Sequence, residues 1–310
     1  MKCSKKGEWF QFSYSEEWNQ LTLETILKEK WKVPKKLLHQ FRMEQRVKVN
    51  GLIQTRWDTQ LKNGDNLQVR LFVDEEYGVE PQFIPISIAY EDDHLLIANK
   101  PAGMDTHPNE GESNTLANAV AFYLQMNGVS TKVRHIHRLD RDTSGGVVFA
   151  KHALAGAILD KMLEKRRISR TYIAFVHGLM KQRRGTIEEK IGRDRHHPTK
   201  RRVSTSGVPA VTHFEMLQYY TKEKVTLVRL QLDTGRTHQI RVHLSHLGHP
   251  IVGDILYGGK HKGIERQALH AEHIHLVHPF TNEILDVAIP WCDDIQLFEK
   301  KIGGLYSKLT

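Results

Sequence analysis

Residues 135–146 of this chain read His135-Ile136-His137-Arg138-Leu139-Asp140-Arg141-Asp142-Thr143-Ser144-Gly145-Gly146. Two arginines, two aspartates and a hydroxyl pair crowd this segment, and the apolar run Val147–Ala150 follows at once. A segment that needed only solubility would spread its charges along one face of a helix or strand. The crowding therefore predicts either a functional site or an ion-pair network at the lip of a buried strand.

The composition is that of a folded, basic protein. The chain has 310 residues, 39% of them hydrophobic and 26% charged, which allows two domains or one large core with an appendage. Lys and Arg number 45 against 36 Asp and Glu, and the net charge of +9 favours a polyanionic partner. The sequence has no apolar run near the ~18 residues that cross a bilayer. We therefore expect a cytoplasmic protein with no membrane partner.

The N-terminal quarter forms a pattern of its own. Apolar residues follow helical spacing over residues 23–31 and, after Pro34, over residues 37–41. Val47-Lys48-Val49 alternates like a strand and ends in Asn50-Gly51, a tight-turn signal, and residues 67–71 alternate again. Two short basic helices followed by small strands predict a compact binding module.

The acidic stretch at residues 74–81 contains Gly and Pro without periodicity and predicts a linker. The rest of the chain reads as one domain of strands and helices, with an exposed basic excursion at residues 181–202. We expect its first helix to be capped by Ser113 or Asn114. Strands are expected at residues 94–99, 147–150, 170–176 and 225–232, and helices near residues 116–124, 154–162 and 237–247.

Four separated motifs resemble the RluA family of pseudouridine synthases. They are His137–Gly146, Arg170–Ala174, Thr234–Leu244 and Leu269-His270-Ala271, in this order. The resemblance covers roughly residues 85–290 and implies an α+β fold with a mixed, largely antiparallel central sheet flanked by helices and loops. It also implies an isomerase that turns a uridine of RNA into pseudouridine with no cofactor and no metal.

The N-terminal segment resembles an S4-type RNA-binding domain, which is common in that family. Its most recognisable pieces are Val47–Gly51 and Gly64-Asp65. We assign residues 1–75 to this small S4-like (α-L) domain, 76–84 to the linker and 85–300 to the catalytic domain. The basic side chains of this domain are expected to contact RNA phosphates; the alternative is a helix face that is only solvated. They are Lys28, Lys30, Lys32, Lys35, Lys36, Arg42, Arg46 and Lys48.

The resemblance assigns Asp140 as the catalytic carboxylate. It would attack the nucleoside at C1′ or draw a proton from the sugar. Both routes need an ionised carboxylate in a partly dry pocket, where a neighbouring cation holds its pKa down. Arg241 is the expected cation, because a guanidinium can bind a carboxylate through two parallel hydrogen bonds, and Arg236 is the competing candidate.

Three more side chains are expected at the pocket. Tyr172 offers a ring that stacks on an extruded uracil and a phenol that can move a proton. Arg138 resembles the arginine that fills the stack vacated by the flipped nucleotide, and Leu269 supplies an apolar wall. Asp142 is interpreted as structural, bonded to the turn or to Arg141.

The sequence has 19 histidines and two cysteines, which raises a metal hypothesis. Two groups of closely spaced histidines occur, but there is no His-Glu-x-x-His motif, so structural or RNA-facing roles are expected. Cys3 and Cys292 lie far apart in the sequence without metal-spaced neighbours. The histidines of the two groups are His243, His246 and His249, and His270, His273, His275 and His278.

Alternative functions remain open at this point. Large-subunit ribosomal RNA is the expected substrate of a monomeric enzyme, with transfer RNA second. A non-catalytic RNA-binding or ribosome-assembly factor is one alternative. The presence of Asp140, Tyr172 and Arg241 together argues against it, because such a factor would not need all three. A metal-dependent nuclease would use Asp140 with Asp142 and would stop in excess chelator.

Overall fold

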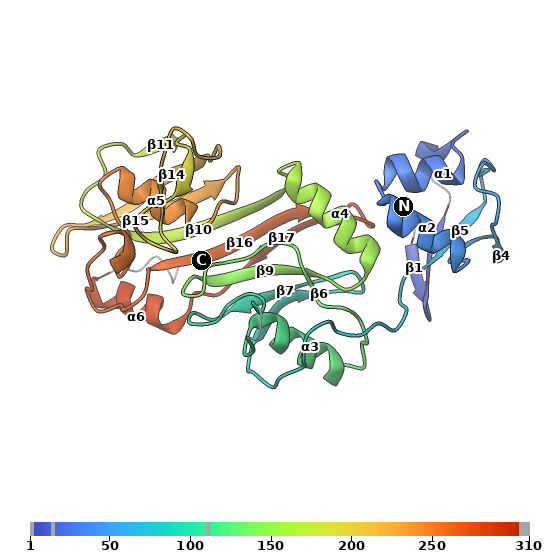
Figure 1. Cartoon of the computed structure of the whole chain (residues 1–310), viewed down its shortest axis with the longest axis horizontal. Helices are drawn as coiled ribbons and strands as arrows, with labels where there is room; N and C mark the ends of the chain where they lie inside the picture. Colours follow the sequence, from blue (N-terminus) through green and yellow to red (C-terminus); the bar gives the residue numbers. More distant parts are fainter. Residues whose placement is uncertain (1–2, 14–15, 110–111, 304–310) are drawn as a thin grey trace.

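The structure is a computed structural model that describes residues 3–13, 16–109 and 112–303. A small N-terminal domain lies at one end of the molecule, beside a large domain built on one extended sheet (Figure 1). None of the described helices is long and apolar enough to cross a membrane.

The small domain is a five-stranded sheet with short helices. Its strand order is β1-β2-β5-β3-β4, and its inner face buries Phe10, Phe12, Leu67 and Val69. The hairpin of β1 and β2 was not among the expected strands, although Phe10 and Phe12 alternate with polar residues as in an amphipathic strand. The elements are β1 Cys3–Lys6, β2 Trp9–Ser13, η1 Glu16–Trp18, α1 Leu23–Thr25, the π-helix η2 Ile26–Lys30, α2 Lys35–Met43, β3 Val47–Val49, β4 Leu52–Ile53 and β5 Asn66–Arg70.

The large domain is a mixed, largely antiparallel sheet flanked by helices, as predicted. The path of the sheet is β11-β14-β15-β10-β16-β9-β7-β6, with β17 paired to β16 and β8 to β9. Its strands are β6 Ser87–Glu91, β7 Leu95–Lys100, β8 Arg134–His135, β9 Ser144–Ala150, β10 Ile168–His177, β11 Arg184–Ile187, β14 Thr212–Tyr220, β15 Val225–Leu232, β16 Leu269–Val277 and β17 Ile284–Ala288. The ribbon β12 Ile191–Arg193 and β13 Arg201–Val203 is separate, and the helices are α3 Leu116–Met126, α4 Ala153–Glu164, α5 Gln239–His246, η3 Ile255–Tyr257 and α6 Asp293–Lys301.

The apolar runs of β7 and β9 are continuous because both faces of the sheet are covered there. Alternate residues of β7 take opposite sides: Leu96 and Ala98 share a core with α3, whereas Leu95 and Ile97 share one with α4. The apolar pattern therefore predicts where these strands lie in the sequence, but not which residues face each of the two cores.

Strand β9 follows the charged residues of the segment quoted above, and it pairs in parallel with β16. Gly145 pairs with Ala271 at a φ of +117°, and a Cβ on Gly145 would lie 2.3 Å from the carbonyl oxygen of Ala271. Any side chain at this position would force the two strands apart. The glycine thus lets the charged turn lie tightly against β16.

The cap of α3 differs from the expectation. Asn114 has a left-handed φ of +62°, so neither it nor Ser113 precedes the helix directly in the extended conformation that an N-cap adopts. Thr115 is the N-cap, and the Asn118 side-chain oxygen accepts hydrogen bonds from the Thr115 backbone N–H at 3.1 Å and hydroxyl at 2.6 Å. The prediction of the cap was wrong by one residue.

The segment at residues 181–202 is not simply an exposed excursion. Strand β11 extends the edge of the large sheet, and β12 pairs with β13. Ile187 and Ile191 are buried, and Ile191 packs with Val242 of α5. Basic residues dominate the composition of this segment and conceal the few apolar positions that anchor it.

The two domains meet through aromatic side chains. Phe10 of the small domain packs edge-on against His94 and Phe280 of the large domain, with ring centroids 4.4 and 5.8 Å apart. Lys5 adds an ion pair with Asp93 at 2.8 Å. Residues 74–81, the expected linker, form neither helix nor strand and lie against the large domain, where Glu75 pairs with Arg134 at 2.7 Å.

Beneath this contact lies a group of polar side chains that we call the junction cluster, formed by Tyr90, Asp92, His94, His152 and His278. Asp92 pairs with His278 at 3.0 Å and accepts the Tyr90 hydroxyl at 2.8 Å, while Nδ1 of His94 lies 2.9 Å from Nε2 of His152. All three histidines are buried. The cluster belongs to the core of the domain junction.

Candidate active site

A cavity of ≈ 600 Å³ gathers residues from all four sequence motifs. Asp140, Tyr172, Arg241 and Leu269 line it, and so do Arg138 and Arg236. Residues 147–169, 175–233 and 245–268 separate these motifs in the sequence, and the fold brings them together. The structure therefore places every candidate of the large domain around one cavity.

The turn that carries Asp140 is held by backbone-directed hydrogen bonds. The Thr143 N–H donates to the Asp140 carbonyl at 3.0 Å, which closes the turn. Thr106 bonds both the N–H and the carbonyl of Leu139 through its hydroxyl, each at 3.1 Å. The Asp140 carboxylate itself is one-fifth exposed, so it faces the cavity from a fixed backbone.

Lys100 supports the same turn through hydrogen bonds, and it was not among the residues predicted from the sequence. Its ammonium is fully buried and donates to the carbonyls of Pro101, Met104 and Arg141, at 3.0, 2.6 and 2.8 Å. Burial lowers the pKa of Lys100 to about 7. The lysine ties the turn after β7 to the residue that follows Asp140.

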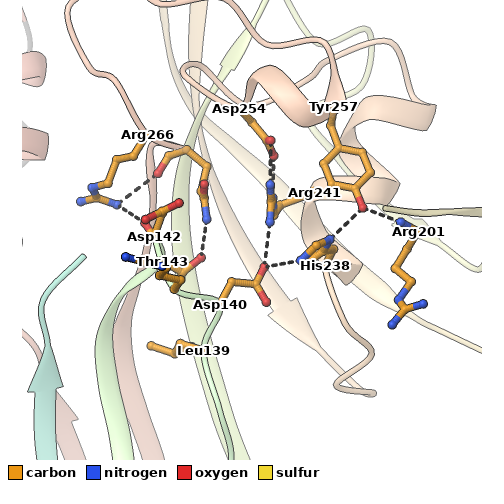
Figure 2. A network of polar contacts seen from close by, with 12 residues as sticks. Leu139, Asp140, Asp142, Thr143, Arg201, His238, Arg241, Asp254, Tyr257 and Arg266 are labelled. Carbon is orange, nitrogen blue, oxygen red and sulfur yellow. Dashed lines mark hydrogen bonds and ion pairs between the residues drawn. The ribbon is translucent and has the colours of Figure 1, made fainter. Parts of the chain in front are cut away.

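Arg241 contacts two carboxylates. Its Nη1 donates to Asp140 at 3.2 Å, while Nε and Nη2 form a two-pronged pair with Asp254 at 2.7 and 2.9 Å (Figure 2). The predicted Arg241–Asp140 contact is present, but the bidentate pairing expected for it is made with Asp254. Burial opposes the charge of Arg241, yet its bonds to Asp254 and then the charge of Asp140 raise its pKa above the usual range.

His238 approaches Asp140 from the other side and was not predicted. Its Nε2 lies 3.9 Å from the carboxylate, and its Nδ1 lies 2.9 Å from the Tyr257 hydroxyl (Figure 2). That hydroxyl also accepts the Arg201 backbone N–H at 2.8 Å. The His238 tautomer with its proton on Nε2 presents an N–H toward Asp140 and accepts the Tyr257 hydroxyl proton at Nδ1. Burial lowers the pKa of His238, despite the charge of Asp140, and this keeps the ring neutral.

The group Asp140, His238, Arg241, Asp254 and Tyr257 is called the site cluster below. It spans the charged turn, helix α5 and the following 3₁₀ helix, and through Arg201 it reaches the ribbon of β12 and β13. Its Asp254 side chain is 1% exposed, whereas Asp140 opens on the cavity. One carboxylate thus fixes the arginine, and the other is available for a ligand.

The remaining predicted pocket residues differ in their surroundings. Tyr172 is buried, and burial raises the pKa of its phenol; the hydroxyl has no hydrogen-bond partner among the described residues. Leu269 is a buried wall of the cavity. Arg138 is exposed at the rim. Arg236 is also exposed and donates to the Pro209 carbonyl at 3.2 Å, so Arg241 and not Arg236 contacts Asp140.

Asp142 supports the turn through its backbone. Its carbonyl accepts a hydrogen bond from Arg266 at 3.0 Å. Arg141, the other expected partner, instead donates to the Gly103 carbonyl at 3.2 Å. Within the described structure no bond joins Arg141 to the Asp142 carboxylate, so of the two expected alternatives the Arg141 contact is not observed.

The basic residues of the small domain fall into two groups. Lys35 and Lys36 are exposed at the start of α2 and make no polar contact with any described residue. Three others are engaged locally: Arg42 lies 4.6 Å from the ring of Trp57, Lys48 lies 4.0 Å from that of Trp9, and Arg46 pairs with Glu44. A cation over an aromatic ring still presents charge to solvent.

No three His, Cys, Asp or Glu side chains of the described residues are grouped so that they could hold a metal ion. Two motif histidines are committed to hydrogen bonds in the core. His243 bonds the Thr212 hydroxyl at 2.8 Å and the Glu189 carbonyl at 2.9 Å, and His270 lies 2.9 Å from the Ser144 hydroxyl. Cys3 and Cys292 are free thiols.

Comparison with known proteins gives the same assignment for both domains. Residues 94–246 match the family model described as RNA pseudouridylate synthase, and residues 10–67 match the RluD ribosomal pseudouridine synthase N-terminal domain. An uncharacterized RNA pseudouridine synthase of Bacillus subtilis, YhcT, is 47% identical over 294 residues, covering 94% of this chain and 97% of that protein.

A second relative and a solved structure support this further. Ribosomal large subunit pseudouridine synthase D of Escherichia coli is 38% identical over 276 residues, covering 83% of each chain. The structure of human RNA pseudouridylate synthase domain containing 1 superposes with a TM-score of 0.57 at 26% identity, covering 73% of this chain and 98% of the human one. The chain therefore belongs to the RluA family of RNA pseudouridine synthases.

Proposed function

We propose that this enzyme converts a uridine of large-subunit ribosomal RNA to pseudouridine, with Asp140 as the catalytic carboxylate. One observation carries the assignment of Asp140: it is the carboxylate of the site cluster that faces the cavity, and Arg241 is held against it by Asp254. The similarity to ribosomal large subunit pseudouridine synthase D supports the ribosomal target over transfer RNA.

The reaction breaks the N1–C1′ bond of uridine, turns the uracil, and forms a C5–C1′ bond. In one route a carboxylate oxygen of Asp140 bonds to C1′ while uracil leaves with the N1 electron pair; C5 then displaces the carboxylate. In the other route Asp140 removes a sugar proton to give a glycal-like intermediate and later returns it. In both, the C5 proton is lost and N1 gains one, so the product is an isomer.

The neighbours of Asp140 suit an ionised carboxylate. Arg241 supplies a permanent charge at 3.2 Å, and His238 presents a neutral N–H from 3.9 Å. Neither group needs to reorganise as charge develops, because Asp254 and Tyr257 already fix them. We propose that both are positioning residues that hold the Asp140 carboxylate aimed at the sugar.

Tyr172 is proposed to face the uracil. Its raised pKa keeps the phenol protonated near neutral pH, so it serves as a stacking surface and a hydrogen-bond donor before it serves as a base. Leu269 closes the apolar side of the pocket, and Arg138 at the rim is placed to fill the stack that the flipped base leaves.

Residues 1–75 are proposed to form an RNA-binding domain, residues 76–84 its linker and residues 85–300 the catalytic domain. The exposed Lys35 and Lys36 support an RNA-facing surface there. We propose that the enzyme acts as a monomer.

The test uses RNA labelled with tritium at uracil C5 and extracted from cells that lack this protein. The purified full chain should release tritium from the large-subunit rRNA fraction, at one or a few mapped uridines, with no loss in excess chelator. Release confined to the transfer RNA fraction would overturn the ribosomal target. Binding without release would favour a non-catalytic factor, and chelator-sensitive cleavage a nuclease.

A further inference from the structure

Arg170 is a buried cation at the cavity that none of the roles above uses. It lies on β10, two residues before Tyr172, lines the cavity and is only 7% exposed. Its Nε is sealed from solvent without a hydrogen-bond partner. Within the described ranges the side chain makes no hydrogen bond, ion pair or ring contact. The side chain therefore meets the cavity through its two terminal nitrogens.

Among the other arginines of this cavity, Arg138 and Arg236 have no ion pair with a described residue but are exposed to solvent. Arg241, which is as buried as Arg170, is paired with two aspartates. Arg166, which is more exposed, pairs with Asp233 at 3.0 Å. A buried charge with no counter-ion is costly, and proteins retain such a group where a ligand completes it. Arg170 thus needs an anion that the described part of this chain does not provide.

Two neighbours fit the guanidinium into place. A Cβ on Gly235 would stand 3.4 Å from Nη1 of Arg170, so the glycine leaves just enough room for the side chain over the turn after β15. His137 lies nearby, and its Nε2 accepts the Val148 N–H at 3.3 Å. Burial, then the charge of Arg170, lowers the pKa of His137 and keeps it neutral.

The tautomer of His137 follows from that bond. With Nε2 accepting, the proton is on Nδ1, which is buried and has no acceptor in the described structure. Arg170 and His137 both line the cavity, and each brings to this part of its floor an N–H donor without a partner among the described residues. Such a floor is complementary to an acceptor, and a formal positive charge selects an anionic one.

We propose that Arg170 binds the phosphodiester group adjoining the target uridine. Residues two apart on one face of a strand are ~7 Å apart, so a uracil stacked on Tyr172 leaves its backbone phosphate within reach of Arg170. RNA carries one anion per nucleotide, and a guanidinium matches phosphate with two parallel hydrogen bonds. Arg170 is a binding and positioning residue in this scheme. The proposal rests on the proposed function.

The experiment is phosphate-ethylation interference. Total RNA from cells lacking the protein is ethylated at random with ethylnitrosourea, incubated with the full chain, and separated into bound and free pools. Ethylated positions are then mapped relative to the uridine that becomes pseudouridine. Wild type should discriminate against ethylation of the phosphate next to that uridine, because the triester has lost its charge. Absence of this interference would overturn the proposal without any variant.

Variants identify the partner of that phosphate. Arg170→Gln should lose interference at that one position, bind about ten- to a hundredfold more weakly, and reduce the salt slope by about one. Arg170→Lys should keep the interference in weakened form. Arg166→Gln is the matched control, because it removes the same charge from the same cavity but from an arginine already paired with Asp233; it should keep the interference position.

The outcomes separate the two proposals. Pseudouridine formation by wild type with an unchanged interference pattern in Arg170→Gln would overturn the role of Arg170 and leave the proposed function standing. No pseudouridine from wild type would overturn the proposed function, and the phosphate contact with it. If Arg170→Gln lowered the melting temperature but kept the interference position, Arg170 would have only a structural role.

Discussion

Strand β9 has a cluster of ionisable side chains beyond each of its ends, and one of the two lines the cavity of ≈ 600 Å³. The site cluster forms around Asp140, just before the strand, and the junction cluster includes His152, just after it. Both contain a carboxylate paired with a cationic or titratable partner. A shifted pKa is therefore no sufficient sign of a site in this protein. The hydrogen bonds of the two carboxylates distinguish the clusters, because both oxygens of Asp92 accept from described residues, whereas Asp140 is bonded to such residues through Oδ2 alone.

The junction cluster is closed by its own hydrogen bonds and by aromatic rings. Nδ1 of His152 accepts the Ala155 N–H at 3.1 Å, so its Nε2 proton is directed to Nδ1 of His94. Phe10, Phe72 and Phe280 cover His94. Each polar group there serves the packing of the small domain against the large one, whereas Asp140 keeps one face for a substrate.

The strongest test of this contrast compares two aspartates. Asp140→Asn should reduce isomerisation to background while RNA binding and melting temperature stay near wild type, because the amide keeps the shape but cannot act as nucleophile or base. Tritium release, RNA binding and thermal unfolding are measured on the same preparation.

The matched variant is Asp92→Asn in the junction cluster. Asp92 accepts from Tyr90 and pairs with His278, so its loss should lower stability and leave turnover per folded molecule unchanged. If Asp92→Asn abolished turnover in the folded protein, or Asp140→Asn did not, the division between the clusters would fail.

A smaller effect is expected from the carboxylate behind Arg241. Asp254→Asn breaks a buried pair and leaves Arg241 with Asp140 alone, so we expect a stability loss of about 3–5 kcal/mol together with reduced turnover. Urea unfolding and tritium release measure the two effects.

The control for Asp254 is Asp294→Asn. Asp294 holds Arg266 with the same two-pronged geometry, at 2.6 and 2.9 Å, but is 43% exposed. Its loss should cost less stability and little turnover. Equal costs for the two variants would show that burial does not set the strength of these pairs.

The junction cluster should make stability depend on pH. Burial lowers the pKa of His94 from 6.5 to about 4, so the unfolded chain binds more protons than the folded one between these values. The contribution of His94 to the free energy of unfolding is therefore complete above about pH 6.5. It falls progressively as the pH decreases toward 4, by about 3 kcal/mol in all. Urea unfolding from pH 7.5 to 4.5 should show this decline.

His94→Phe isolates that contribution. The ring still packs among Phe10, Phe72 and Phe280 but does not titrate, so the slope of stability against pH should be shallower. His270, whose pKa burial also lowers to about 4, remains in both proteins and cancels in the comparison. An unchanged slope would remove His94 from the pH response.

The sequence predicted the parts of this molecule that depend on local pattern. Strand β15 occupies the expected residues 225–232, where polar residues interrupt an apolar run, and β7, which begins with a contiguous apolar run, is displaced by one residue. The four motifs located Asp140, Tyr172 and Arg241 through resemblance. The cap of α3 was missed because the left-handed backbone of Asn114 is not encoded in composition.

The partners of Asp140 and Arg241 could not be predicted from the sequence for a different reason. Asp254, His238 and Tyr257 contribute to the site through distances set by tertiary folding. His238 lies within the third motif but was given no role there, and Asp254 and Tyr257 lie outside all four motifs. Lys100 lies 41 residues before the carbonyl of Arg141 that it binds. A single sequence shows which residues are charged, but the fold decides which charges meet.

The smallest expected effect concerns two tyrosine hydroxyls, one at each end of β9. Tyr172→Phe keeps the ring against the uracil and removes a neutral donor, so we expect RNA binding to be retained and turnover to fall about tenfold, the effect of one ordinary hydrogen bond. Tyr90→Phe removes a hydroxyl that donates to Asp92 at 2.8 Å, so it should lower stability by a similar free energy and leave turnover intact. Single-turnover assays and urea unfolding of both variants give the comparison. A complete stop in Tyr172→Phe would make the phenol an essential acid or base; wild-type turnover would limit Tyr172 to stacking.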